Sequence, residues 1–176
     1  TATGTKNSTT FLRGDNTFNA PPLGGITEAD MWRLTANTNS GTNADIASNW
    51  ERVDDSCFEK IGTGMTESSG IFSFPSTGKY LVSEVWQLQI ADGDIAEVFG
   101  KITIDNSSYS TRTNAIGYVH GGSHYMMFSN QYLVDVTNIS NVKMKFTTSS
   151  FATGTVLIGY TSKNTSSVGF TRLGDT

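Results

Sequence analysis

Apolar and polar residues alternate with a period of two along the centre of the chain. Every second residue from 80 to 90 belongs to one row, and all of them are apolar except a single glutamate. This row consists of Tyr80, Val82, Glu84, Trp86, Leu88 and Ile90. The other row mixes apolar and polar side chains: Leu81, Ser83, Val85, Gln87 and Gln89. Because successive side chains of a strand point to opposite faces, the pattern predicts a long antiparallel strand with one face in a core. Glu84 is the one charge expected on that face.

Turn residues separate this strand from the apolar runs on either side. Pro75 and Gly78 lie between the short run 71–74 and the long strand, and Asp92-Gly93-Asp94 follows it. Gly121-Gly122 interrupts a later apolar stretch in the same way. Proline presets φ and glycine adopts positive φ, so each of these places predicts a chain reversal and a β-hairpin.

The remaining apolar runs are short and evenly spaced, with Trp32 and Leu34 expected to point inward. They cover residues 30–36, 50–53, 58–61, 95–104, 115–119, 124–136, 142–146, 156–160 and 168–173, and polar loops are expected at 37–48, 62–70 and 105–114. No segment has a clear helical period. About ten strands joined by turns predict an all-β fold, a two-sheet antiparallel sandwich spanning residues 26–176.

Residues 1–25 differ from the rest because they are small and polar. Phe11, Leu12 and Phe18 are expected to anchor this segment to a neighbouring subunit. Pro21-Pro22 favours an extended backbone and Gly24-Gly25 a joint. The segment cannot form a core by itself, so we expect an extended linker, stalk or strap.

The composition supports an all-β fold and argues against two classes of partner, nucleic acid and membranes. The chain has 18 glycines, only 16% charged residues and a net charge of −4. Nucleic acid and anionic membranes favour basic surfaces, and the sequence has neither a lysine and arginine run nor an apolar stretch long enough to span a bilayer. The lone cysteine, Cys57, excludes an internal disulfide and is expected to be a small buried side chain.

No arrangement of residues predicts catalysis or a bound cofactor. The chain lacks a G-x-S-x-G elbow, an H-E-x-x-H pair and a phosphate-binding loop, so we expect a non-enzymatic protein. Asp92 with Asp94, and Asp54 with Asp55, could bind Ca²⁺, but turns are the favoured interpretation. The triplet Arg13-Gly14-Asp15 is likewise interpreted as a turn rather than an integrin ligand.

One loop has side chains suited to recognition. His120 and His124 flank Gly121-Gly122, and Tyr118 and Tyr125 lie beside them. Across a hairpin the two imidazoles could face each other, but two ligands are too few for a metal site. Exposed histidine and tyrosine side chains suit stacking and hydrogen bonding, so contact with a sugar or a receptor is the preferred interpretation.

Four phrases of the sequence resemble known families. IFSFPSTGKYLVS at 71–83 resembles the signature hairpin of C1q-like domains, a jelly-roll family related to tumour necrosis factor, and the resemblance covers residues 26–176. A cysteine common near this hairpin in vertebrate members is absent. KNSTTFLRGDNTFNAPP is similar to a segment of bacteriophage tail fibres and appendages. ITEADMWRLTA and VGFTRLGDT are similar to C1q-like heads of marine phage virion proteins.

The resemblance implies a ten-stranded jelly-roll head that forms a homotrimer, with one sheet face near the threefold axis. It implies a virion protein on the particle surface, serving host attachment or decoration. Residues 1–25 would contact other virion proteins, and the head would contact a host surface glycan or protein. The alternatives are a secreted C1q-like carbohydrate-binding or signalling module and, more remotely, a small polysaccharide hydrolase.

Overall fold

A computed structural model describes residues 1–19 and 25–176, so the predictions for Pro21-Pro22 and Gly24 lie outside the described residues. Thirteen strands and no helix are present in these two ranges. The strands are β1 (Phe11–Leu12), β2 (Phe18–Asn19), β3 (Ala29–Leu34), β4 (Trp50–Arg52), β5 (Thr66–Ser68), β6 (Ile71–Ser73), β7 (Gly78–Ile90), β8 (Ile95–Thr103), β9 (Ser110–Tyr118), β10 (His124–Val136), β11 (Lys143–Ser149), β12 (Val156–Leu157) and β13 (Ser167–Gly174).

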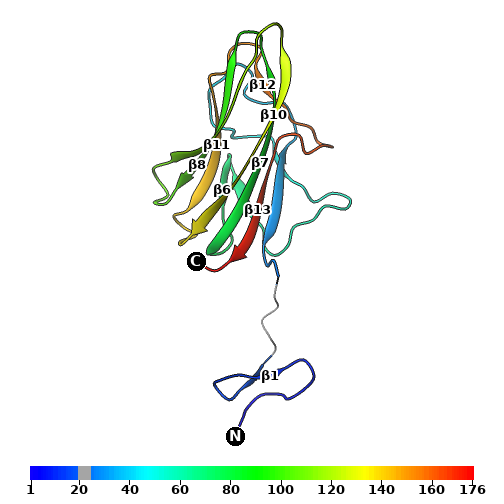
Figure 1. Cartoon of the computed structure of the whole chain (residues 1–176), viewed down its shortest axis with the longest axis vertical. Helices are drawn as coiled ribbons and strands as arrows, with labels where there is room; N and C mark the ends of the chain where they lie inside the picture. Colours follow the sequence, from blue (N-terminus) through cyan, green and yellow to red (C-terminus); the bar gives the residue numbers. More distant parts are fainter. Residues whose placement is uncertain (20–24) are drawn as a thin grey trace.

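Two antiparallel sheets pack face to face and confirm the predicted all-β sandwich (Figure 1). The six-stranded sheet has the order β10-β7-β13-β3-β4, with β12 also paired to β7. The five-stranded sheet has the order β5-β6-β11-β8-β9. Eleven strands therefore build the described part of the head, where ten were expected. The expected strand at 58–61 is absent, apart from a bridge between Ile61 and Ala29.

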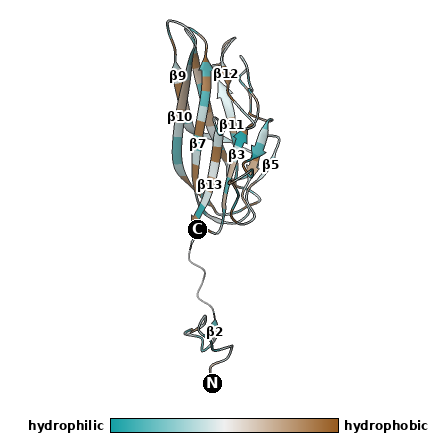
Figure 2. Cartoon of the chain, turned by 90° about the vertical axis from the view of Figure 1, so that its right-hand side faces the viewer, coloured by the Kyte–Doolittle hydropathy of each residue, from teal (hydrophilic) through white to brown (hydrophobic). Residues whose placement is uncertain are grey.

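The core lies between the sheets and takes the row of β7 that the alternation predicted (Figure 2). Tyr80 is 1% exposed, and Trp86 and Glu84 are fully buried. Leu34 and the partly buried Trp32 pack into the same core, as expected. An aromatic cluster fills its centre, with ring centroids 5.1–6.2 Å apart among Trp50, Phe72, Trp86 and Phe146.

The three predicted hairpins are wrong. The turns at 74–77, 91–94 and 119–123 each connect a strand of one sheet to a strand of the other, joining β6 to β7, β7 to β8 and β9 to β10. Proline and glycine specify a reversal, but they do not specify whether the two strands pair or face each other. At the first turn, Phe74 packs against Tyr80 with ring centroids 4.8 Å apart, because both rings enter the core.

A hairpin does occur in the segment 62–70, which was expected to be a loop. β5 pairs with β6 through the two-residue turn Ser69-Gly70, and both residues have positive φ, 52° and 81°. These values are typical of a type I′ turn, whose twist matches that of the paired strands. The turn was not predicted from the sequence because serine is not one of the residues preferred at its first position. Glu67 Oε1 accepts a hydrogen bond of 2.6 Å from Gly70 N and closes the turn.

Two further expectations are corrected at the surface. Residues 1–19 are not simply extended, because β1 and β2 form a short antiparallel pair and Thr3 bridges to Thr17. Cys57 is exposed rather than buried. It lies in the loop after β4, which is held to the outer side of the sheet by ion pairs between the buried Arg33 and the acidic residues Glu51 and Asp55.

Candidate functional site

A buried polar cluster joins the edge strands of both sheets around Glu84. Glu84 Oε2 accepts a hydrogen bond of 3.0 Å from Trp86 Nε1, and Glu84 Oε1 accepts one of 3.1 Å from Thr113 Oγ1 on β9. The hydroxyl of Tyr132 on β10 also donates to Glu84 Oε1. None of the described lysine or arginine side chains forms an ion pair with this carboxylate. Hydrogen bonds from three neutral donors therefore compensate for its burial.

The surroundings of the cluster leave no room for a larger residue on β8. A Cβ added at Gly100 would lie 2.7 Å from Glu84 Oε1, and Thr113 Oγ1 is nearer still. Burial, followed by the nearby Glu84 carboxylate, raises the pKa of the Tyr132 phenol well above its ordinary value. The side-chain nitrogen of Asn130, opposite Glu84 in the β7–β10 pair, is buried with no partner among the described residues. The hydrogen bonds of the cluster hold β7, β9 and β10 together.

The loop with the predicted receptor residues does not bring them together on one surface. Tyr118 is the last residue of β9 and Tyr125 is the second residue of β10, and both side chains are exposed, 58% and 64%. Their strands belong to different sheets, and each tyrosine lies on the outward row of its own sheet. His120 lies in the crossover between the sheets and His124 is the first residue of β10, and both side chains are exposed. β9 and β10 belong to different sheets, so the two imidazoles do not face each other across a hairpin.

The aspartates of the neighbouring turn have structural partners. Asp92 Oδ1 accepts a hydrogen bond of 2.7 Å from Gly121 N, and backbone hydrogen bonds from Gly122 and Gly121 lower the pKa of Asp92. Asp94 Oδ2 accepts hydrogen bonds from Ala152 N and from the Thr155 hydroxyl. The described residues contain no group of three or more histidine, cysteine, aspartate or glutamate side chains that could bind a metal ion.

The triplet Arg13-Gly14-Asp15 forms the tight turn between β1 and β2. Arg13 N donates to Thr17 O at 2.8 Å, and Asn16 has a positive φ of 63°. Asp15 Oδ1 accepts hydrogen bonds from Thr17 Oγ1 at 2.6 Å and from Thr17 N at 3.0 Å, and these lower the pKa of the carboxyl group. The aspartate is thus used within the turn. The predicted anchors next to it are accessible, since Phe11 is 45% exposed, Leu12 is 50% exposed and Phe18 is half-buried.

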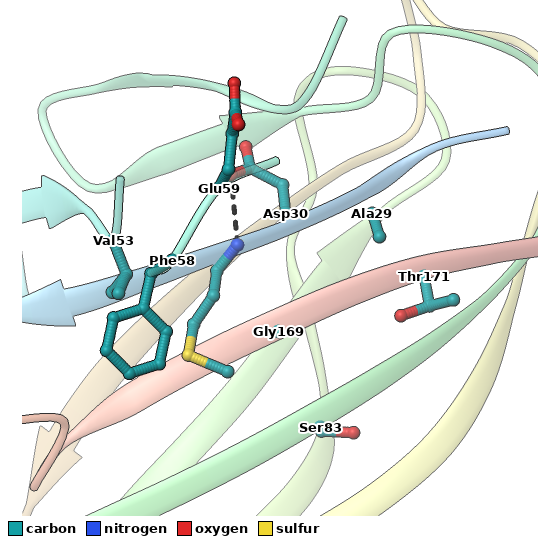
Figure 3. A pocket seen from close by; sticks show the side chains of 9 residues that line it. Ala29, Asp30, Val53, Phe58, Glu59, Ser83, Gly169 and Thr171 are labelled. Carbon is teal, nitrogen blue, oxygen red and sulfur yellow. Dashed lines mark hydrogen bonds between the residues drawn. The ribbon is translucent and has the colours of Figure 1, made fainter. Parts of the chain in front are cut away.

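A hollow lies on the outward face of the six-stranded sheet (Figure 3). Its floor is a row across three strands, in which Gly169 lies between Ser83 and Met31 and contributes no side chain. Phe58, 46% exposed, forms one wall, and the volume is about 270 Å³. Asp30 supports the other side through hydrogen bonds with Met31 N, Trp32 Nε1, Arg52 Nε and Met65 N.

The edge strands β9 and β10 carry exposed apolar side chains on their outward rows. Ile116 on β9 is 55% exposed, and Met127 and Leu133 on β10 are 62% and 65% exposed. Ile104, after β8, is 74% exposed and borders a second hollow of about 360 Å³ beside Leu133. Ile104 and Leu133, which border the same hollow, mark a candidate interaction surface.

Sequence reasoning found neither the hollow nor the apolar edge. Met31 and Phe58 lie on different segments, and the floor at Gly169 comes from a third. The sequence does contain one sign of the exposed edge, because Met127 and Leu133 are apolar residues in the polar row of an alternating strand. Their position on an edge strand required the order of the sheet.

Comparisons with solved structures identify the fold. Eiger TNF from S. frugiperda superposes with a TM-score of 0.64 at 12% identity, covering 86% of this chain and 96% of that one. Murine APRIL gives 0.60 at 13%, covering 83% and 98%. The PRD1 vertex protein P5 gives 0.50 at 14%, covering 86% and 100%. The chain has a tumour-necrosis-factor-like jelly-roll fold. No protein-family model and no curated protein matches the sequence.

The order of the strands in the jelly roll determines where the surfaces described above lie. β10 and β9 are the outermost strands of their sheets on the same side of the sandwich, and each carries exposed apolar side chains on its outward row. The hollow lies on the outward face of the six-stranded sheet, over β13 and β3. Among the described residues no helix is long and apolar enough to cross a membrane.

Proposed function

We propose that this chain is a non-enzymatic virion protein of a bacteriophage, displayed on the particle surface as a trimer for host attachment or decoration. The observation that carries the proposal is the pair of uncovered apolar surfaces on one tumour-necrosis-factor-like head. The edge of β9 and β10 projects Met127 and Leu133, and the adjoining sheet face offers the hollow with Met31 and Phe58.

The two surfaces differ in kind, which supports a ring rather than a two-fold dimer. A two-fold contact would place the same patch against itself, whereas an edge on a face is a heterologous contact that closes into a ring. The resemblance to C1q-like heads implies that the ring has three members. In this arrangement the edge of each head lies on the six-stranded sheet of its neighbour.

The placement on a virion is supported by the N-terminal segment and by the likeness to the PRD1 vertex protein P5. Residues 1–19 expose Phe11 and Leu12 without a core of their own. We assign these residues, with Phe18, to contacts with neighbouring subunits or other virion proteins.

Light scattering on the full chain tests the assembly. Three copies of the 19.0 kDa chain give a mass of about 57 kDa, which we expect at micromolar concentration. Leu133→Glu and Met31→Glu should each yield monomers, because an unpaired carboxylate would be buried in the contact. Ile139→Glu, at a 43% exposed apolar residue in the loop after β10, is the matched control and should remain trimeric. A stable monomeric wild type would overturn the trimer.

Immunogold labelling tests the location. An antibody against the head should label the surface of purified particles of the phage that encodes the chain. Absence from the particles, together with secretion into the medium, would favour the C1q-like carbohydrate-binding or signalling module instead.

A further inference from the structure

Three lysines gather on the outward face of the five-stranded sheet. Lys143 and Lys145 are two residues apart on β11 and point to the same side, about 7 Å apart along the strand. Lys101 on β8 lies directly opposite Lys145 in the antiparallel register. We call Lys101, Lys143 and Lys145 the lysine patch. It concentrates a quarter of the 12 lysine and arginine residues of an acidic chain.

Three acidic residues lie near the patch, and only one of them forms an ion pair with it. Asp45, from the loop before β4, forms an ion pair of 2.8 Å with Lys145. Glu97, farther along β8, accepts hydrogen bonds from Asn114 and Ser150, and Asp105 beyond β8 accepts from its own loop. Lys101 and Lys143 have no ion pair among the described residues.

One lysine of the patch is held in place. The Lys145 ammonium lies 4.5 Å from the centroid of the Tyr109 ring while it contacts Asp45. This arrangement fixes the direction of the charge and reduces the entropy lost when a ligand binds. Like charges directly opposite each other on paired strands destabilise a sheet, so the pair Lys101–Lys145 does not serve the stability of the fold.

The residues around the lysines suit a sugar chain. Hydroxyl groups border the patch at Ser73, which pairs with Lys143, and at the exposed Thr111, which pairs with Lys101. Phe99 lies two residues before Lys101 on the outward row of β8 and is half-buried. Hydroxyls provide hydrogen bonds to sugar hydroxyls, and an aromatic face packs against a sugar ring.

We propose that the lysine patch binds an acidic polysaccharide of the host surface. This inference rests on the proposed attachment function, whose receptor chemistry it specifies. In the proposed trimer the six-stranded sheet is covered and the five-stranded sheet faces outward, so three patches are presented to one polymer. Three weak contacts to a repeating anion then give an avidity that one head lacks.

Binding to defined polymers tests the proposal. We expect the full chain to bind immobilised alginate, a carboxylate polysaccharide, and dextran sulfate, but not neutral dextran. Raising the salt concentration from about 50 mM to about 500 mM should release it, because screening weakens contacts between exposed charges. The variant Lys101→Gln/Lys143→Gln should bind alginate at least about tenfold more weakly.

A second variant separates the patch from net charge. Lys6→Gln/Lys163→Gln removes the same charge from two exposed lysines elsewhere and should bind like the wild type. Equal weakening in both variants would overturn the proposal, as would binding to neither polyanion. Tighter binding to a DNA duplex or to phosphatidylglycerol vesicles than to alginate would overturn the choice of a polysaccharide.

The outcomes also distinguish this proposal from the proposed function. If the chain is a trimer and is labelled on particles but binds neither polyanion, only the proposed role of the lysine patch is refuted. Patch-dependent alginate binding by a chain that is absent from particles refutes the virion role and leaves the patch intact.

Discussion

The Tyr132 hydroxyl donates a hydrogen bond to Glu84 Oε1, although the two residues are not direct partners in the sheet. Glu84 lies opposite Asn130 in the β7–β10 register, so Tyr132 reaches it along the diagonal. Thr113 reaches the same oxygen from the other sheet. One carboxylate oxygen thus fastens both edge strands, and those strands form the apolar edge of the proposed assembly.

Removing the Tyr132 hydroxyl should destabilise the head. We expect Tyr132→Phe to lower the free energy of unfolding by about 1.5–3 kcal/mol, the range for a hydrogen bond to a charged group. Glu84→Gln should cost a similar amount, because a neutral amide oxygen accepts these hydrogen bonds more weakly than a carboxylate. Urea denaturation of both single variants and the double variant measures the coupling. Additive losses would contradict a direct bond between the two side chains.

Gly100 should not tolerate a methyl group. In Gly100→Ala the new Cβ would meet Thr113 Oγ1 and Glu84 Oε1, which are fixed by their hydrogen bonds. We expect a loss of about 2 kcal/mol or more in stability, typical of overpacking in a core. Gly174→Ala is the matched control, since no atom lies within 4 Å of its added Cβ. Equal midpoints for the two variants in a thermal melt would refute the crowding at Gly100.

Tyr132 should resist ionisation at alkaline pH. Its pKa is raised in the folded state by burial and by Glu84, so the folded state retains a proton that the unfolded state loses above about pH 10. The contribution of this group to stability is complete below that pH and falls as the pH rises further. In a titration at 295 nm, we expect the Tyr132 phenol to ionise only on unfolding.

The Tyr132→Phe variant is the control for the alkaline titration. It should lose the late-ionising component, and its stability should decline less steeply above about pH 10. If the titration of Tyr132→Phe still shows the late-ionising component, that component belongs to another tyrosine.

The N-terminal anchors should be needed to incorporate the chain into particles but not to fold the head. Phe11→Ser/Leu12→Ser/Phe18→Ser leaves the turn bonds of Arg13 and Asp15 to Thr17 in place. We expect an unchanged melting temperature for the head and a severe loss of the chain from purified particles, measured by quantitative mass spectrometry. Normal incorporation would refute the anchoring role. Ile139→Ser, at an exposed apolar residue of the head, should be incorporated normally.

The sequence predicted the parts of the fold that depend on local alternation. The buried row of β7 and the inward positions of Trp32 and Leu34 follow from a period of two, because burial requires every second side chain to be apolar. Assignment of strands to sheets could not follow in the same way. The turn at Gly78 has identical chemistry whether it closes a hairpin or crosses between layers.

The functional surfaces were less accessible to prediction for the same reason. Glu84 was recognised as an unusual charge, but Thr113 and Tyr132 lie 29 and 48 residues away and meet it only through the packing of β9 and β10. The hollow at Gly169 needs three strands in order. The lysine patch depends on the register of β8 against β11, which no local pattern in either strand contains.

The free edge of β10 has a consequence for folding in the cell. The strand is thirteen residues long and contains no lysine, arginine or proline, the residues that commonly discourage pairing with foreign strands. The N–H and C=O groups on its outer side pair with no strand of residues 1–19 or 25–176, and they form a template to which another extended chain can add. Newly made heads would therefore be vulnerable to aggregation as monomers, and the proposed trimer would cover this edge.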